Sequence, residues 1–400
     1  MIEHDKIIRL AARGDGITQT GRHAPGAVPG DYIGPDGTTV VAGPHRTVPP
    51  CRHFEKCGGC QLQHADEEVL ARFVADRVIL AAAGQGVTAQ TVLPTHLSPP
   101  RSRRRAVLHA QVNGKNVLLG FREAGSHRIV DMRECHIILP ELFATVGPLR
   151  NLLRQHAGRA PVDVDLTATD QGIDCLIKGM TIEGYEAHED LLDLAKAQKL
   201  ARLSLDQGWG AETMWEPEPV TVTLGGVPVP FPAGAFSQAT HDGEKVLQDD
   251  VMRYCGTSRA IADLFAGLGT LSLPLAAMGK EVALFEADQA AHFASRRALS
   301  HLNGSSQAVH RDLFRAPLQP DELKRFDTIV LDPPRAGAKA QVDALAKSRV
   351  DRIVYVSCNP ASWARDAATL NAAGYRLQAL RPVGQFRWST HVELSSLFVR

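Results

Sequence analysis

Short apolar strands alternate with segments of helical pattern over residues 261–357, and this alternation constrains the fold more than any other feature of the chain. Such alternation indicates parallel strands in one sheet with helices packed on its faces. In open sheets of this kind, ligands bind in the crevice at the carboxyl ends of the strands. The sequence therefore predicts an α/β domain whose site is built from the residues that follow each strand.

Three segments are expected along the 400 residues of the chain. Residues 1–48 are rich in glycine, proline and short β-like runs, so a small β-rich segment is expected there. Residues 49–232 mix an amphipathic helix with a hairpin around Asn113-Gly114, which indicates a mixed α+β domain. Residues 233–400 hold the alternating pattern and are expected to form the α/β domain.

The composition excludes several classes of protein. Lysine plus arginine and aspartate plus glutamate both number 44, so nucleic-acid binding must rest on local patches rather than on a chain-wide basic field. No apolar run reaches membrane-span length, and the first residues lack the features of a signal peptide. We therefore expect a cytoplasmic protein without a membrane partner, and nothing in the sequence demands more than a monomer. In that compartment the seven cysteines are expected to bind metal or to act in catalysis.

The loop over residues 266–270 reads Ala-Gly-Leu-Gly-Thr and directly follows the first strand of the alternating region. Its glycines, Gly267 and Gly269, let a ligand approach the backbone closely, although an isolated Gly-x-Gly is also common in ordinary turns. Glu286 ends the next strand and can bind both hydroxyls of a ribose. Asp312 ends the third strand and can accept a hydrogen bond from an adenine amino group. The alternative is that both acids are simply solvated strand ends.

Two ligand-binding motifs are missing from this loop, and their absence limits which class of ligand it can bind. The spacing has no third glycine of a dinucleotide fingerprint, and no phosphate-loop lysine follows it. The pattern therefore favours a nucleoside without phosphates, such as S-adenosylmethionine.

A thiol and a carboxylate are the candidate reactive groups. Cys358 directly follows the strand 353–357, and Asn359-Pro360 then turns the chain away. A thiol at the carboxyl end of a parallel strand faces the ligand crevice, where it can act as a nucleophile. The alternative is a buried structural cysteine. Glu393, at the start of the last strand, is the candidate base, and the alternative is a surface carboxylate.

The fourth strand ends in Asp332-Pro333-Pro334, where the paired prolines hold Asp332 over the crevice. An Asp-Pro-Pro turn also occurs in enzymes that methylate exocyclic amines of bases. An amine is already nucleophilic, whereas carbon 5 of a pyrimidine must first be activated by addition of a thiolate to carbon 6. The presence of Cys358 therefore favours methylation of carbon 5, and amine methylation stays open as the alternative.

Together these motifs resemble those of the RNA uridine-C5 methyltransferases that carry an iron–sulfur cluster, a group that acts mainly on large-subunit ribosomal RNA. The resemblance implies a C-terminal Rossmann-like class I methyltransferase domain, a mixed α+β central RNA-binding domain and a truncated TRAM- or OB-like N-terminal segment. It also implies that Cys358 is the nucleophile, that Glu393 is the base, and that S-adenosylmethionine is the methyl donor. The positions that it implies for binding the cofactor or framing the target base are Gln238, Phe265, Gly267, Gly269, Thr270, Glu286, Asp312 and Asp332.

Some positions depart from the family pattern. Thr240 and Thr270 stand where relatives often have asparagine, and residues 386–389 read Phe-Arg-Trp-Ser where relatives usually have Phe-Pro-x-Thr. These departures bear on cofactor contacts and on the choice of substrate rather than on the reaction.

Four cysteines form a candidate metal site. Cys51, Cys57 and Cys60 lie in one loop with two glycines, and Cys135 can complete the set from a distant segment. Four thiols suit either zinc or an iron–sulfur cluster. The resemblance implies a 4Fe–4S cluster with a structural role.

The expected RNA-binding residues gather around the same cysteines. The densest basic run is 101–105, and further cations follow at Arg122, His127, Arg128 and Arg133. The alternative is a solvated basic edge. The implied substrate is a looped or bulged uridine in structured RNA, most directly 23S rRNA, which can be flipped toward Cys358. A tRNA substrate and a non-catalytic RNA-binding assembly factor are the remaining alternatives.

Overall fold

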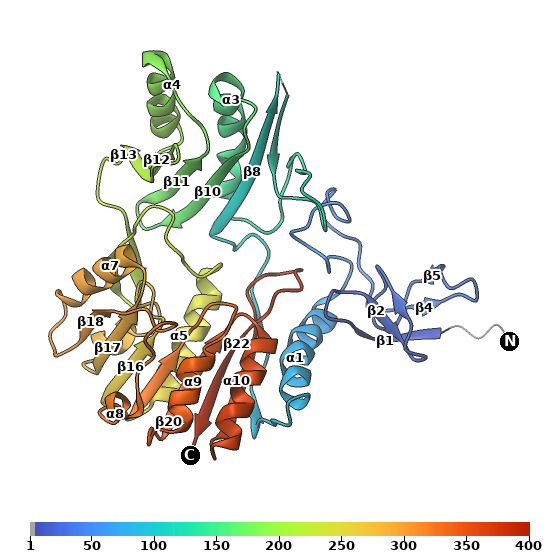
Figure 1. Ribbon diagram of the computed structural model, residues 1–400. Coiled ribbons are helices and arrows are strands. Elements are labelled where there is room, and N and C mark those ends of the chain that lie inside the picture. Colours follow the sequence, from blue (N-terminus) through green and yellow to red (C-terminus); the bar gives the residue numbers. More distant parts are fainter. Residues whose placement is uncertain (1–4, 115) are drawn as a thin grey trace.

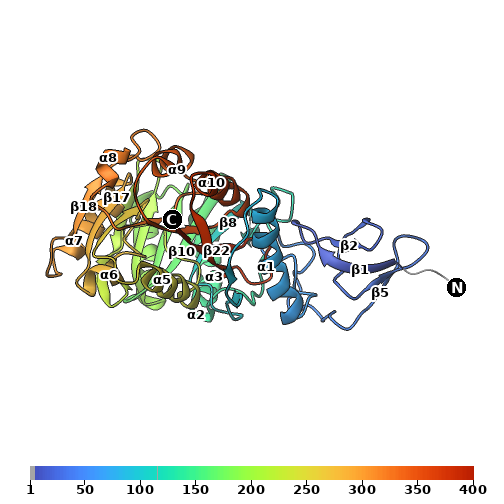
Figure 2. The ribbon, with the colours of Figure 1, turned by 90° about the horizontal axis from the view of Figure 1, so that it is seen from below.

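The computed structural model describes residues 5–114 and 116–400 of the chain. Figure 1 shows three main sheets: a small N-terminal one, a central one, and a large one that holds most of the C-terminal half. In the turned view of Figure 2 the N-terminal sheet projects away from the rest of the molecule. Within the described residues no helix is long and apolar enough to cross a membrane.

The N-terminal sheet has five short strands in the order β3-β2-β1-β4-β5. Its own core is small: among the described residues, the buried cluster beneath it consists of Ile7, Ala24, Ala27 and Ile33. The strands are β1 (Asp5–Leu10), β2 (Gly16–Thr18), β3 (His23–Ala24), β4 (Tyr32–Ile33) and β5 (Val40–Val41).

The central domain is a six-stranded sheet in the order β13-β12-β11-β10-β8-β9, with three helices. The expected hairpin is present, although residue 115 at its tip lies outside the described residues. The elements are β8 (Arg105–Asn113), β9 (Asn116–Gly120), α2 (Pro140–Ala144), α3 (Val146–His156), β10 (Val162–Thr169), β11 (Gly172–Lys178), α4 (Gly184–Ala197), β12 (Leu200–Asp206) and β13 (Ala211–Trp215). A separate hairpin, β14 (Thr221–Leu224) and β15 (Val227–Pro230), leads into the C-terminal domain.

The large sheet contains nine strands, with the parallel set β18-β17-β16-β19-β20 followed by antiparallel β22. Its strands are β6 (Thr91–Val92), β7 (His96–Leu97), β16 (Ala260–Leu264), β17 (Glu281–Glu286), β18 (Gln307–His310), β19 (Thr328–Leu331), β20 (Arg352–Ser357), β21 (Arg376–Gly384) and β22 (Glu393–Val399). Its helices are α1 (Glu67–Ala83), α5 (His241–Cys255), α6 (Leu273–Ala277), α7 (Gln289–Leu299), α8 (Pro320–Leu323), α9 (Lys339–Ala346) and α10 (Pro360–Ala372).

Alternate side chains of the central strands enter two different cores, as expected for a sheet covered on both faces. On β20, Ile353 and Tyr355 join the core formed with α1, α9 and α10. Val354 and Val356 of the same strand join the core formed with α5, α6 and α7. The run of apolar residues that predicted this strand therefore reflects burial on both of its faces.

Part of the segment predicted as the central domain, residues 49–232, packs with the C-terminal domain instead. Helix α1 and strands β6 and β7 lie in the segment assigned to the central domain, yet they belong to the large sheet. The pairs Ala379↔Thr91 and Val383↔His96 join β6 and β7 to β21. Helix α1 also packs against α10. Two-residue strands carry too little pattern to indicate a partner nearly 290 residues away, so this pairing could not be predicted.

Candidate active site

A cavity of about 650 Å³ opens at the carboxyl ends of the parallel strands. We call it the glycine-loop cavity. It brings together nine of the sequence-predicted residues: Gln238, Phe265, Gly267, Thr270, Glu286, Asp312, Asp332, Cys358 and Glu393. Gly269 is the exception. A Cβ atom at Gly269 would lie 2.8 Å from the Leu273 side chain, so this glycine serves close packing of the loop instead.

The glycine loop is held by contacts from two other elements. The Gly267 N–H donates to Glu286 Oε2 at 2.7 Å, and Gln248 Nε2 on α5 donates to the Thr270 carbonyl at 2.9 Å. Phe265 has a left-handed φ of 64°, which is unusual for a residue with a side chain and typical of functional loops. Helix α6 begins only at Leu273, so the loop rather than a helix terminus lines the cavity.

The two strand-end acids are oriented by backbone N–H groups. Glu286 Oε1 accepts from the N–H groups of Ala287 at 2.7 Å and Asp288 at 2.6 Å. Asp312 Oδ1 accepts from the Phe314 N–H at 2.9 Å. A carboxylate has about four acceptor positions, so both acids retain capacity for a ligand. They are therefore fixed in place and are not merely solvated strand ends.

Asp263 also lines the glycine-loop cavity, and sequence reasoning missed it. Its side chain is 1% exposed, and neither carboxyl oxygen has a hydrogen-bond partner. Burial raises the pKa of Asp263 to about 7, opposed by the Ser272 hydroxyl and reinforced by the charge of Glu286. A charged residue inside an otherwise apolar strand was the available signal, because such a group is costly unless something pairs with it.

Strand pairing brings the nucleophile and base candidates together. In the antiparallel pair β20 and β22, Ser357 lies opposite Leu394. The next step of that register sets Cys358 beside Glu393, and both line the same cavity. Cys358 is partly exposed while Glu393 is only 4% exposed. The thiol is thus accessible at the cavity wall and is not a sealed core cysteine.

Burial raises the pKa values of the acidic groups of the site, and neighbouring acids add to the shifts of Asp332 and Cys358. Burial raises the pKa of Glu393 to about 7, opposed by a hydrogen bond from Gln385. Burial, then the charges of Glu393 and Asp263, hold the pKa of Asp332 well above its usual range. Burial and the charges of Glu393 and Asp332 raise the pKa of Cys358 to about 11, whereas Arg335 lowers it.

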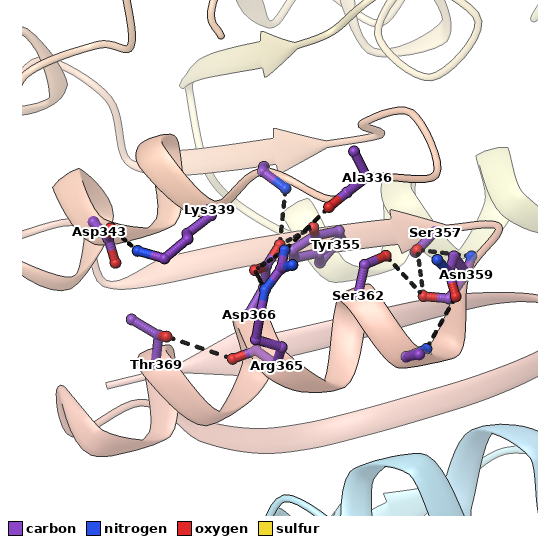
Figure 3. Close-up of polar contacts among 12 residues, drawn as sticks. Ala336, Lys339, Asp343, Tyr355, Ser357, Asn359, Ser362, Arg365, Asp366 and Thr369 are labelled. Atoms are coloured by element: carbon purple, nitrogen blue, oxygen red, sulfur yellow. Dashed lines mark hydrogen bonds and ion pairs between the residues drawn. The ribbon is translucent and has the colours of Figure 1, made fainter.

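The turn that carries Cys358 lies between Ser357 and Asn359, and Figure 3 shows the polar contacts of these two residues. Asn359 caps α10 by accepting from the Ala361 N–H at 3.1 Å, and its Nδ2 donates to the Arg335 carbonyl at 2.8 Å. Beneath the turn, buried Asp366 accepts from the Tyr355 hydroxyl at 2.8 Å. Asn359 therefore ties the nucleophile's turn to the loop that follows Asp332.

A second cavity, of about 740 Å³, meets the first one at the reactive residues. We call it the arginine-lined cavity. The residues common to both cavities are Phe236, Arg335, Cys358 and Glu393. Its other walls come from the central domain, the cysteine loop and the segment before β22, and include Arg103, Arg105, Arg122, Gly58, Gly59, Gln61, Phe386, Ser389 and His391. One cavity thus reaches the thiol from the glycine loop, and the other reaches it from the basic central domain.

The arginine run at 101–105 is not a solvated basic edge, which was the alternative to its predicted role in RNA binding. Arg104 pairs with buried Glu244 and donates to the Gln238 carbonyl at 3.1 Å. Arg105 pairs with Asp165 at 3.7 Å. Arg105 therefore joins two strands of the central domain, and Arg104 joins the central domain to the C-terminal domain.

Arg103 and Arg105 nevertheless present their side chains to the arginine-lined cavity. The Arg103 guanidinium lies 5.4 Å from the ring centre of Phe386, and that of Arg105 lies 5.4 Å from the ring centre of Phe236. These cations therefore act at the cavity wall, while Arg101 alone in the run is fully exposed.

The four predicted metal ligands line one further small cavity, together with Phe54, Phe121, Met132 and Arg103. None of the seven cysteines forms a disulfide. Within the described residues, no group of three or more His, Cys, Asp or Glu side chains is arranged to hold a metal ion.

The loop that carries three of these cysteines contacts both neighbouring parts of the molecule. Its Gly58 N–H donates to the Arg122 carbonyl at 2.8 Å, on the central domain. The N–H groups of Gln61 and Leu62 both donate to the Trp388 carbonyl, at 2.7 and 2.9 Å, in the segment before Glu393.

Comparison with known proteins decides the family. A family profile described as tRNA (Uracil-5-)-methyltransferase matches residues 305–400, which include Cys358 and Glu393, and a methyltransferase small-domain profile matches residues 227–352. A Zymomonas mobilis protein described as an uncharacterized RNA methyltransferase is 48% identical over 396 residues, covering 99% of each chain. The 23S rRNA (uracil(1939)-C(5))-methyltransferase RlmD of Pectobacterium atrosepticum is 31% identical over 380 residues, covering 90% of this chain and 82% of its own. The chain belongs to the RNA (uracil-C5)-methyltransferase family.

Membership makes the protein an RNA methyltransferase and confirms the predicted family and enzyme class. The fold class is confirmed as well. The crystal structure of the tRNA (uracil-54, C5)-methyltransferase of Pyrococcus abyssi, in complex with S-adenosyl-L-homocysteine, superposes with a TM-score of 0.77 over 99% of both chains. At 22% sequence identity this second likeness concerns the fold alone.

Proposed function

We propose that this RNA methyltransferase transfers a methyl group from S-adenosylmethionine to carbon 5 of a specific uridine, with 23S rRNA as the first candidate substrate. The observation that carries the proposal is the meeting of the two cavities at Cys358 and Glu393. A methyl donor in the glycine-loop cavity and a flipped base in the arginine-lined cavity would face each other across the thiol. A base inside a helix cannot reach such a thiol, so a looped or bulged uridine is the expected target.

The residues of the site supply each step that carbon-5 methylation requires. Bound S-adenosylmethionine supplies an electrophilic methyl group. Cys358, as thiolate, adds to carbon 6 and pushes electrons onto the base carbonyl, to which protonated Asp332 can donate a hydrogen bond. Carbon 5 then takes the methyl group. Glu393 removes the carbon-5 proton, the double bond re-forms and the sulfur leaves.

The glycine-loop cavity fits the methyl donor group by group. The unpartnered carboxyl of Asp263 suits the ammonium of the donor's methionine part. The fixed carboxylates of Glu286 and Asp312 suit the ribose hydroxyls and the adenine amino group. The rings of Phe265 and Phe314, with centres 5.2 Å apart, offer apolar walls for the adenine.

The four-cysteine cavity is proposed to hold a 4Fe–4S cluster with a structural role. All four thiols line one cavity with apolar walls, which suits a cluster ligated by four thiolates. The cysteine loop contacts both the central domain and Trp388, so a cluster there would hold the two walls of the arginine-lined cavity together. Iron and sulfide analysis with a visible absorption spectrum tests this, because zinc bound by four thiols would be colourless.

Mapping of 5-methyluridine in total RNA tests the proposed function. Cells that lack the protein should lose one 5-methyluridine, and the wild-type chain should restore it. The Cys358→Ala variant should not restore it, although its affinity for S-adenosylhomocysteine should stay near normal. A lost site in tRNA would replace the ribosomal substrate by a transfer RNA, in line with the matched family profile. Restoration by Cys358→Ala would overturn the mechanism.

A further inference from the structure

The buried amide of Gln385 links Gln238 to the base Glu393. Gln385 follows β21, is 1% exposed, and was not singled out by its sequence context. Its Oε1 accepts from the Ala239 N–H at 3.1 Å, and its Nε2 donates to Gln238 Oε1 at 2.8 Å. The same side chain also lies close enough to Glu393 to lower the pKa of that carboxyl, against the larger effect of burial. All the polar atoms of this amide are therefore in use.

These contacts fix the direction of the Gln238 amide. A backbone N–H can only donate, so the atom of Gln385 that faces Ala239 must be its oxygen. The nitrogen of Gln385 is then left for Gln238, and a nitrogen that donates requires an oxygen opposite it. Gln238 lines the glycine-loop cavity, so the group it has left to offer there is its NH₂. The orientation of both amides is therefore set by the Ala239 N–H, which can donate a hydrogen bond but cannot accept one.

The position of this donor points to one atom of the base. Gln385 links Gln238 to Glu393, and both of these residues line the glycine-loop cavity, so the NH₂ of Gln238 is presented to the same cavity as the carboxylate that removes the carbon-5 proton. The ring atom next to carbon 5 is carbon 4, which carries a carbonyl oxygen in uracil and an amino group in cytosine. The fixed NH₂ of Gln238 can donate a hydrogen bond to the carbonyl oxygen of uracil. With cytosine, it would instead face the amino group, which is also a donor, and neither group would have an acceptor.

We propose that Gln385 is a positioning residue that makes the site uracil-specific, because it holds the Gln238 amide with its NH₂ toward the oxygen on carbon 4. The inference rests on the proposed function for the identity of the base. The relay from Ala239 through Gln385 to Gln238 can be tested without RNA.

The decisive variant is Gln385→Glu, which keeps the shape of the side chain. Its carboxylate can still accept from the Ala239 N–H, but it then presents a second acceptor to Gln238. Gln238 must turn its NH₂ toward that acceptor, so its oxygen faces the cavity and suits the amino group of cytosine. Gln385→Met removes both polar atoms, frees the Gln238 amide and should give an intermediate selectivity.

Selectivity is measured by trapping on short RNAs that contain the mapped target position as 5-fluorouridine or 5-fluorocytidine. Fluorine at carbon 5 blocks proton removal, so the covalent adduct with Cys358 persists on a denaturing gel. The ratio of uridine to cytidine adducts should fall at least about tenfold in Gln385→Glu relative to wild type. Gln341→Glu, which buries a carboxylate at an equally buried amide outside both cavities, should keep the wild-type ratio.

Three results would overturn the inference. One is an unchanged ratio in both Gln385 variants. Another is an unchanged ratio with weakened binding of S-adenosylhomocysteine by calorimetry, because the donor would then serve the cofactor. The third comes from RNA-free protein: side-chain ¹⁵N–H resonances of Gln238 that are the same in wild type and Gln385→Glu would exclude the relay. Absence of any adduct with the wild-type protein would instead count against the proposed methylation of uridine.

Discussion

At the scale of single residues, the site depends on carboxyl groups that burial keeps partly protonated near neutral pH. Burial raises the pKa of Glu393 to about 7, close to the pH at which such an enzyme works. A group with that pKa accepts a proton and returns it readily, which suits a general base. Burial, together with the charges of Glu393 and Asp332, raises the pKa of Cys358 to about 11, so the free thiol is a weak nucleophile before a substrate arrives.

Replacement of Glu393 by glutamine should separate its two effects on Cys358. The change removes a negative charge that raises the thiol's pKa, so the thiolate fraction at pH 8 should increase. Alkylation of Cys358 by iodoacetamide should therefore become severalfold faster, measured by mass spectrometry of the labelled peptide. Turnover should nevertheless stop with a covalent RNA adduct, because the carbon-5 proton has no acceptor. Slower alkylation together with normal turnover would contradict both roles.

The pH dependence of cofactor binding should report on Asp263. Its pKa in the free protein is raised to about 7, above its value of 3.8 in an unperturbed chain, so the carboxyl is mostly protonated below pH 7. An ammonium group pairs only with the ionised form, so affinity for S-adenosylhomocysteine should rise between pH 6 and pH 8. Calorimetry of wild type and Asp263→Asn should show this rise only in the wild type. A similar pH dependence in Asp263→Asn would assign it to another group.

A site residue could be predicted from the sequence only where the residues next to it in the chain indicated its role. Cys358 and Asp332 follow apolar strands directly, so their position at the sheet edge could be inferred. Asp263 was visible only as one charge within an apolar strand. Gln385 gave no signal, because its role comes from contacts with Ala239 and with side chains that are distant in sequence.

At the scale of secondary structure, the turn after β20 is the element that positions the chemistry. Asn359 caps α10 and ties the turn to the Arg335 carbonyl. Asn359→Ala should cost about 1 kcal/mol of unfolding free energy through loss of the cap. The turnover rate should fall further than this loss explains, because the turn that carries the thiol is no longer tied to the loop after Asp332. Asn371→Ala, at the exposed end of the same helix, is the matched control for urea denaturation and methylation assays. Equal effects of the two variants on turnover would argue against the positioning role.

Helices and strands that are buried on both faces could be predicted from the sequence, because burial demands a continuous apolar run. The strands β16, β17, β19 and β20 are of this kind, whereas the edge strand β18 is partly exposed. The sequence predicted an RNA-binding role for the arginine run at 101–105, but it could not indicate that Arg104 and Arg105 pair with Glu244 and Asp165, which lie far away in sequence. Local sequence patterns therefore predict burial better than they predict which residue a charged side chain pairs with.

At the scale of the whole molecule, the arginine-lined cavity has walls from segments that are separated by more than 200 residues. Residues 103–125 of the central domain, the cysteine loop and residues 386–391 all contribute to it. The cysteine loop contacts the other two walls through Gly58 and through the pair Gln61 and Leu62. The cavity proposed to receive the base therefore depends on the loop, whereas the glycine-loop cavity does not.

Loss of the proposed cluster should weaken RNA binding and spare cofactor binding. In Cys57→Ser, iron content should fall, and amide hydrogen exchange in residues 386–391 should become severalfold faster, because the donors to the Trp388 carbonyl are no longer held. Affinity for structured RNA should drop, while affinity for S-adenosylhomocysteine should stay within about twofold, since no cysteine of the loop lines the glycine-loop cavity.

Cys175→Ala, in the core of the central domain, is the control for loss of a cysteine that has no proposed ligand role. It should leave iron content and exchange in residues 386–391 unchanged. If Cys57→Ser loses its iron and keeps wild-type exchange at Trp388, the cluster does not hold the cavity walls together. If cofactor affinity falls as much as RNA affinity, the loop supports the whole C-terminal domain, because an effect confined to one cavity cannot lower both affinities equally.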